Sequence, residues 1–197
     1  PEIHLILFQI FNIADKVKYE LGIFALLLIQ ALLNFRQLKT MDINFFPYYL
    51  SDFSMAKTSR FFIGTIINWL TDNPNEAWLN NFARTILFLG LILAAVLIGR
   101  VVRSVEEDKR VPLYAVILFF CTGSFTMHIF SRFFGMMDIY MFGFAAISLA
   151  LLGNKYLRWL VPLLCFAGVM INVVFVFSYF PAVLLVMLYL AAVSEKK

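Results

Sequence analysis

A few charged and hydrogen-bonding side chains interrupt a chain that is otherwise strongly apolar. They are Asp52, Lys57, Arg60, His128, Arg132, Asp138 and Asn172. A carboxylate such as Asp52 can act as a catalytic or ligand-binding group, and charged side chains of this kind are costly in lipid, so they suit a wet cleft. We therefore predict Asp52 as a catalytic residue and the other six as substrate-binding residues, if the fold brings them together.

Several of these residues also have a simpler structural interpretation. Asp52 could cap a helix, because "SDFSMAKTSR" begins an amphipathic segment and an aspartate there satisfies free backbone amides. His128 could be an interior histidine bonded to a hydroxyl or a carbonyl. Arg132 could extend to lipid headgroups or pair with Asp138. The residues alone leave both interpretations open.

The composition indicates a membrane protein. Hydrophobic residues make up 62% of the 197 positions, charged residues only 14%, and the mean hydropathy is +0.87. A water-soluble chain of this length needs more polar surface than that. The net charge of +4 comes from basic residues scattered at segment ends, which argues against a nucleic-acid surface.

No metal, cofactor or disulfide is expected. Cys121 and Cys165 both lie inside apolar runs, and the chain has no Cys-x-x-Cys or Cys/His ligand spacing. Gly-rich phosphate loops and the serine or zinc motifs of soluble enzymes are absent as well.

The apolar runs predict an all-α fold, a single integral membrane domain over residues 1–197 with about six spans. The predicted spans are 21–35, 82–103, 112–131, 137–152, 157–173 and 174–193. Residues 1–20 are expected to form an interfacial helix or the end of a truncated span, because the chain starts at Pro1 and would begin inside a longer protein. Pro181 predicts a helix break near "FSYFP".

Residues 36–81 form an insert between the first two spans. Between Pro47 and Pro74 the apolar residues recur at roughly helical spacing, which predicts one or two amphipathic helices along the membrane surface. The insert would cover a wet cleft as a lid.

Basic residues predict the orientation of the spans. With six spans, the basic groups Lys16 and Lys18, Arg100 to Arg110, Lys155 and Arg158, and Lys196 and Lys197 all fall on one face, which would be cytoplasmic together with both termini. The insert, Arg84 and the candidate site residues would then share the outer boundary. Cys121, Ser124, His128, Ser131 and Arg132 would form a polar stripe on one helix face.

Three sequence blocks carry a resemblance. "DFSMAKTSRFFIGTI", "FFGMMDIY" and "INVVFVFSYFP" are similar to signature blocks of a group of uncharacterised bacterial polytopic membrane proteins. The chain departs from that group in having Asn172 where the group has a histidine, and in lacking an arginine before Asp138. The general layout more loosely resembles the C-type glycosyltransferases, which implies an acidic residue in the first outer loop and a lipid-phosphate-linked sugar as donor.

Three classes of function follow from these observations. The first is a bacterial envelope enzyme in the plasma membrane that acts on a lipid-linked glycan or a polyprenyl-phosphate sugar at the outer face. The second is a non-enzymatic membrane subunit whose polar cluster holds a protein partner. The third is a small transporter, for which Gln30, Ser124, Thr126 and Ser148 are the candidate polar residues within the spans.

Overall fold

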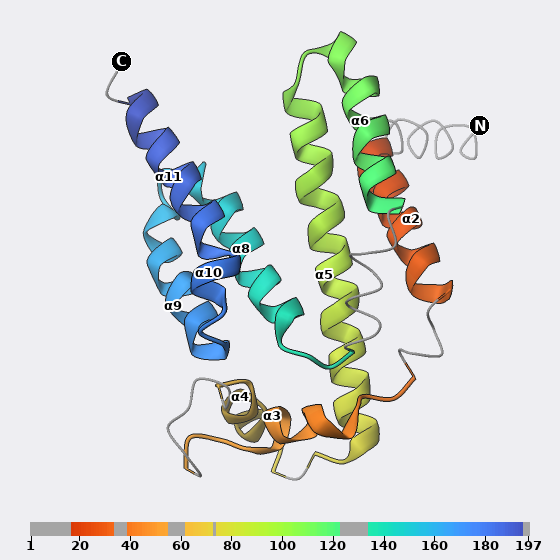
Figure 1. Cartoon of the computed structure of the whole chain (residues 1–197), viewed down its shortest axis with the longest axis vertical. Coiled ribbons are helices and arrows are strands. Elements are labelled where there is room, and N and C mark those ends of the chain that lie inside the picture. The colour runs from red at the N-terminus through yellow and green to blue at the C-terminus, as the bar shows by residue number, and fades with distance from the viewer. Residues whose placement is uncertain (1–16, 34–38, 55–61, 73, 123–133, 195–197) are drawn as a thin grey trace, which may run out of the picture.

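The computed structural model describes residues 17–33, 39–54, 62–72, 74–122 and 134–194, and over these residues it is all-helical without strands (Figure 1). The all-α prediction is confirmed to that extent. The helices are α2 (Lys18–Leu33), α3 (Phe46–Leu50), α4 (Phe62–Leu70), α5 (Glu76–Ser104), α6 (Glu107–Thr122), α8 (Asp138–Leu152), α9 (Val161–Ile171), α10 (Phe175–Ser178) and α11 (Phe180–Ser194), with 3-10 turns η1 (Ile43–Phe45) and η3 (Arg158–Leu160).

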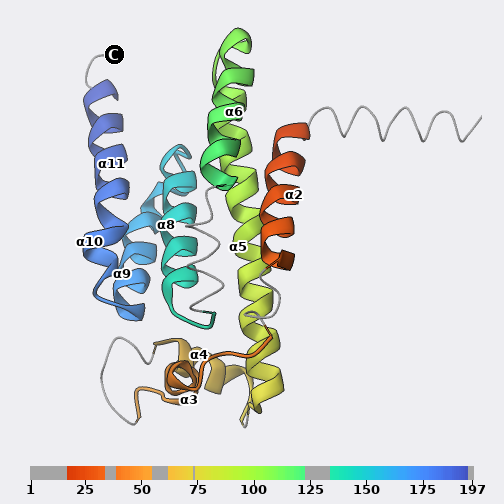
Figure 2. The ribbon, with the colours of Figure 1, turned by 45° about the vertical axis from the view of Figure 1, so that its right-hand side comes forward.

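Two groups of helices stand side by side. α2, α5 and α6 pack together, α8, α9, α10 and α11 form the second group, and contacts between α5 and α8 join the two (Figures 1 and 2). α3 and α4 lie crosswise at one end, where α5 and α8 begin and α9 ends. We call residues 39–54 and 62–72 the platform and this end the platform end. The opposite end is the basic end.

Helix α5 is the longest helix of the first group. Asn75 caps it, since its side chain accepts a hydrogen bond from the backbone N–H of Trp78 at 2.8 Å, and Glu76 and Arg103 complement the helix dipole at its two ends. At 1.5 Å per residue its 29 residues extend over about 43 Å. Among the described helices, α5 is long and apolar enough to cross a membrane.

Other apolar helices are shorter than a typical span. They cover Asp138–Leu152, Arg158–Ile171 and Phe180–Ala192. The 15 residues of α8 extend over only about 22 Å, against about 30 Å for a hydrocarbon core. The six-span bundle therefore stays a prediction, while membrane association has the support of α5.

A partly buried ion pair joins α2 to α5 near the basic end. The Arg103 guanidinium donates to Glu20 Oε1, and Glu20 is only 8% exposed. A Cβ on Gly99 would lie 2.5 Å from the Glu20 side chain, so only glycine leaves room for the carboxylate at this point. The sequence analysis did not single out this pair.

The expected helix break lies at Tyr179, between α10 and α11. Because proline disfavours a helical conformation at the residue before it, Pro181 predicted a break that includes Phe180. In the structure α11 already begins at Phe180. Pro181 is the second residue of α11, and proline is tolerated in the first helical turn because its missing N–H would have no partner there.

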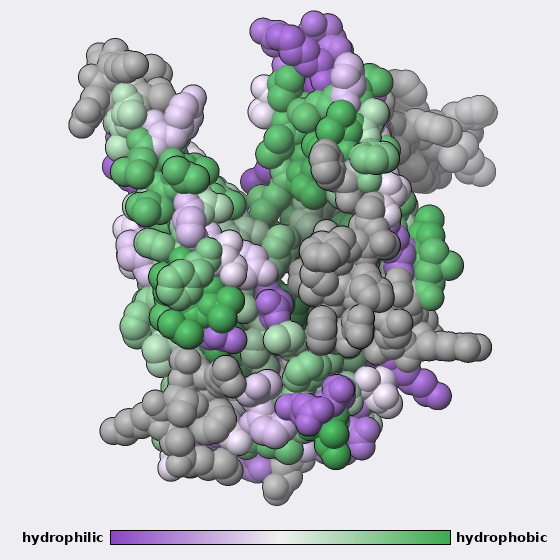
Figure 3. All heavy atoms as spheres, in the orientation of Figure 1, coloured by the Kyte–Doolittle hydropathy of each residue, from purple (hydrophilic) through white to green (hydrophobic). Residues whose placement is uncertain are grey.

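The surface is divided between apolar sides and polar ends. Figure 3 shows hydrophobic side chains along the helices and hydrophilic ones gathered at the turn between α5 and α6 and around the platform. Large exposed apolar residues continue along α11, where Leu185 is 67% and Tyr189 66% exposed. Such sides suit contact with lipid or with another membrane helix.

Candidate functional site

The candidate residues that the structure describes come from separate elements of the platform end. Asp52 follows α3, Asp138 begins α8, and Asn172 ends α9, whose helix contacts α4. Arg84, which was expected at the same boundary, lies in the first part of α5. Lys57, Arg60, His128 and Arg132 lie outside the described residues, as does most of the predicted polar stripe. The predicted pair of Arg132 with Asp138 is likewise outside them.

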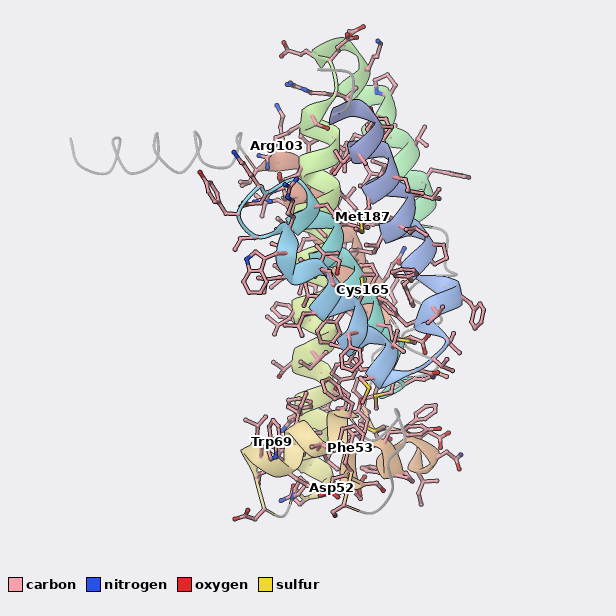
Figure 4. All side chains as sticks on the ribbon, turned by 90° about the vertical axis from the view of Figure 1, so that its left-hand side faces the viewer. Asp52, Phe53, Trp69, Arg103, Cys165 and Met187 are labelled. Atoms are coloured by element: carbon pink, nitrogen blue, oxygen red, sulfur yellow. The ribbon has the colours of Figure 1, made fainter. Side chains whose placement is uncertain are left out.

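Asp52 holds the loop after α3 against α4. Its Oδ1 accepts hydrogen bonds from the backbone N–H of Ser54 at 2.9 Å and from the Ser54 hydroxyl, and its Oδ2 accepts from the Asn68 side-chain amide at 2.8 Å. Figure 4 shows Asp52 at the end of the molecule opposite to Arg103. The half-buried carboxylate is thus held in a fixed orientation by the platform itself.

The platform is packed closely enough to require a glycine. The Phe53 N–H donates to the Thr65 hydroxyl at 3.1 Å, which brings the loop onto α4. A Cβ on Gly64 would lie 1.9 Å from the carbonyl oxygen of Ser51, so no other residue fits without moving backbone. The one or two helices predicted between Pro47 and Pro74 correspond to α3 and α4, which pack with η1 as one layer.

Two tyrosines attach this layer to the start of α8. The Tyr49 hydroxyl donates to the carbonyl oxygen of Gly135 at 2.7 Å, and the Tyr140 hydroxyl donates to Tyr49 at 3.3 Å, all within the core. Gly135 has a φ of +92°, which favours glycine at this chain reversal. Burial raises the pKa of Tyr49 well above its usual range, so its hydroxyl stays protonated and remains a donor.

A second attachment joins the platform to α5. The Asn80 side-chain oxygen accepts a buried hydrogen bond from the Met41 N–H at 2.7 Å. One turn later, Arg84 donates to the Asn81 side-chain oxygen at 2.7 Å and to the carbonyl oxygen of Lys39. Hydrogen bonds therefore hold the platform against α5 and against the start of α8. The platform is a packed layer at the end of the bundle, and its role as a lid stays a prediction.

Asp138 and Asn172 occupy the neighbouring helix ends. Asp138 is half-buried in the first turn of α8 and lies within electrostatic reach of Tyr179 at the break between α10 and α11. Asn172 accepts a hydrogen bond from the Val174 N–H at 3.1 Å and so shapes the turn out of α9. No group of three histidine, cysteine, aspartate or glutamate side chains with metal-site geometry occurs within the described part of the chain.

An apolar groove starts beside these polar groups and runs between α5 and α8. We call it the α5–α8 groove; its volume is about 210 Å³, and its lining includes Ile86, Gly90 and Leu93 of α5 and Tyr140, Gly143 and Ile147 of α8. These residues recur at helical spacing on the facing sides of the two helices.

Sequence reasoning missed the residues that build the site. Tyr49, Asn68, Asn80 and Tyr140 carry the buried or half-buried contacts, yet none was singled out. The available signal was the presence of amide and phenol groups inside apolar segments, because buried groups of this kind require partners.

No protein-family model matches the chain, and neither a curated protein nor a solved structure matches it.

Proposed function

We propose that the protein is an integral membrane enzyme that acts on a polyprenyl-phosphate-linked sugar at the outer face of a bacterial plasma membrane. The observation that supports this proposal is that Asp52, Arg84 and Asp138, from three distant parts of the chain, belong to elements that meet at the same end of the bundle. Trp69 and Ile43 are 82% and 79% exposed on the same layer, which suits a surface that rests on lipid headgroups.

The reaction assigns a role to each charged group. A hydroxyl of the acceptor attacks the anomeric carbon of the sugar, and the bond from that carbon to the phosphate oxygen breaks. The proton of the hydroxyl passes to the Asp52 carboxylate, and the polyprenyl phosphate leaves as an anion. Arg84, with Lys57, Arg60 and Arg132 as further predicted cations, stabilises the negative charge that develops on the leaving phosphate.

Replacing Asp52 by Asn tests the proposal. The variant keeps the size of the side chain and one oxygen for the Ser54 or Asn68 contact, but the amide cannot accept a proton. We expect sugar release from a polyprenyl-phosphate sugar in proteoliposomes to fall by about 10²-fold or more. Asp42→Asn is the matched control, because it makes the same change at an exposed carboxylate of the platform, and it should keep most of the activity.

A second candidate, a non-enzymatic membrane subunit, has one specific observation in its favour. Both oxygens of Asp52 accept hydrogen bonds inside the platform, as expected for a purely structural carboxylate. In that case Asp52→Asn and Asn68→Ala would weaken co-purification of a membrane partner to a similar degree. No release of sugar by the wild-type protein, together with such a parallel loss, would favour the subunit over the enzyme.

A further inference from the structure

We infer that the turn between α8 and α9 binds anionic phospholipid headgroups in the membrane leaflet at the basic end. This turn covers residues 153–159, "GNKYLRW", and we call it the α8–α9 turn (Figure 1). Every residue of it is exposed. The inference goes beyond the enzymatic proposal and does not depend on it, because it requires only that the bundle lies in a membrane.

The α8–α9 turn carries positive charge that the surrounding helices do not offset. Lys155 and Arg158 are both exposed, and residues 139–194, which form the second group of helices, contain no aspartate or glutamate. Asp138 begins α8 at its opposite end, about 22 Å away at 1.5 Å per residue. Salt screens exposed charges beyond about 8 Å under physiological conditions, so Asp138 does not neutralise the turn.

Cations elsewhere at the basic end have acidic neighbours. The turn between α5 and α6 has acidic residues at positions 106–108, and Lys109 pairs with Glu106 there. Arg103 pairs with Glu20 of α2. The general excess of basic residues on a cytoplasmic face would not distinguish these regions from the α8–α9 turn. Because its charge is not compensated in this way, the α8–α9 turn is the more favourable place for an anion.

Aromatic and apolar side chains beside the two cations favour a lipid over a soluble anion or an acidic protein. Tyr156 and Trp159 each follow one of the cations and are 80% and 69% exposed, and such rings are most favourable at the level of the headgroups. Leu163 and Phe166, on one face of α9, are 60% and 61% exposed. Charged, aromatic and apolar side chains thus follow one another in the order of headgroup, interface and acyl chain.

Asn154 holds the backbone of the α8–α9 turn. Its side-chain oxygen accepts a hydrogen bond from the Tyr156 N–H at 2.9 Å. Its carbonyl oxygen accepts from the Leu157 N–H at 3.2 Å and from the Arg158 N–H at 3.0 Å. The backbone that carries the two cations is therefore ordered before a headgroup binds, which reduces the entropy lost on binding.

The experiment uses Trp159 as a reporter of the lipid beside it. The chain has three tryptophans, so Trp69→Phe together with Trp78→Phe leaves Trp159 alone. The full chain is placed in vesicles of phosphatidylcholine and phosphatidylglycerol in which one of the two lipids is brominated, because bromine quenches tryptophan fluorescence only at short range. We expect phosphatidylglycerol to be preferred beside Trp159 by about fivefold or more, the preference that one basic residue gives near an anionic surface.

Charge variants and a second reporter separate the α8–α9 turn from the rest of the molecule. Lys155→Gln with Arg158→Gln should abolish the preference at Trp159. Arg100→Gln with Lys109→Gln is the matched control, because it removes two exposed cations from the same end, and it should keep the preference. A chain with Trp69 as its single tryptophan should show no preference, because acidic residues outnumber basic ones among the described residues of the platform end.

Four results would overturn the inference. They are equal quenching of Trp159 by the two brominated lipids, the same preference at Trp69 as at Trp159, an unchanged preference in a folded Lys155→Gln, Arg158→Gln variant, and an equal loss in the Arg100→Gln, Lys109→Gln control. The first two use the unaltered turn and do not depend on how a variant folds. Sugar release is a separate measurement, so its absence would remove the enzyme and leave the lipid site intact.

Discussion

Tyr49 connects the platform to the start of α8. It is fully buried, and its hydroxyl joins the Gly135 carbonyl and the Tyr140 hydroxyl, so three segments meet at one oxygen atom. A buried carbonyl that loses its hydrogen-bond donor destabilises the folded state, because its lost hydration is no longer compensated. The attachment of the platform to the start of α8 therefore depends in part on this phenol.

Replacing Tyr49 by Phe should show this directly. The ring still fills its place, but the Gly135 carbonyl loses its donor and the Tyr140 hydroxyl loses its acceptor. We expect the free energy of unfolding to fall by about 1–3 kcal/mol, measured by denaturation in detergent. Tyr156→Phe is the control, because Tyr156 is 80% exposed and should tolerate the change. Equal stability of the two variants would show that the bond contributes nothing.

At the scale of elements, the platform depends on a close approach of α4 to the preceding loop. The atom nearest to a Cβ on Gly64 is the backbone oxygen of Ser51, which cannot rotate away as a side chain could. Gly64→Ala should therefore push α4 off the loop and destabilise the platform by about 1–3 kcal/mol.

Limited proteolysis measures the effect of Gly64→Ala. Cleavage between residues 39 and 72 should become faster than in the wild-type protein, while α5 and α8 remain resistant. Gly153→Ala, which adds a Cβ in a place where none of the described atoms is near, should leave the cleavage pattern unchanged. A wild-type pattern for Gly64→Ala would mean that the loop can adjust at no cost.

The positions of the helices could largely be predicted from the sequence, because apolar runs and prolines determine helix formation through neighbouring residues. The insert was expected to hold one or two helices between Pro47 and Pro74, and α3 and α4 lie there. The break near Pro181 was expected for a local reason as well, and lies at Tyr179.

The hydrogen-bond partners in the candidate site could not be predicted from the sequence in this way. Tyr49 bonds to a residue 86 positions away, and Glu20 pairs with Arg103 across 83 positions. Such pairs are decided by how helices pack, and spacing along one chain carries no information on that. Of the seven predicted site residues, Asp52, Asp138 and Asn172 are described and belong to elements at the platform end, while the gathering of all seven stays a prediction. The partners of Asp52 depended on the fold of the platform.

At the scale of the whole molecule, the basic residues are distributed unevenly between the two ends. The described basic residues near the basic end are Lys18, Arg100, Arg103, Lys109, Arg110, Lys155 and Arg158. The platform end carries Lys39 and Arg84 among its described residues. Loops that stay in the cytoplasm carry the excess of lysine and arginine, so this asymmetry predicts a cytoplasmic basic end and an external platform.

Single cysteines can test that orientation in intact cells. In a Cys121→Ala, Cys165→Ala background, Asp72→Cys introduces a thiol at an exposed platform position, and Asp108→Cys introduces one in the exposed first turn of α6. A membrane-impermeant maleimide should label the first variant from outside. The second should react only after the membrane is permeabilised, because α5 separates the two positions by about 43 Å of helix.

The same labelling also tests the proposed enzyme, because a polyprenyl-phosphate sugar at the outer face is reached only from the side on which the platform lies. Reversed labelling would keep α5 as a membrane span and move the reaction to the cytoplasmic face. Labelling of both variants from outside would mean that α5 does not cross the membrane. Helices α8 and α9, with 15 and 11 residues, could not span the membrane in its place, because each is shorter than a hydrocarbon core of about 30 Å.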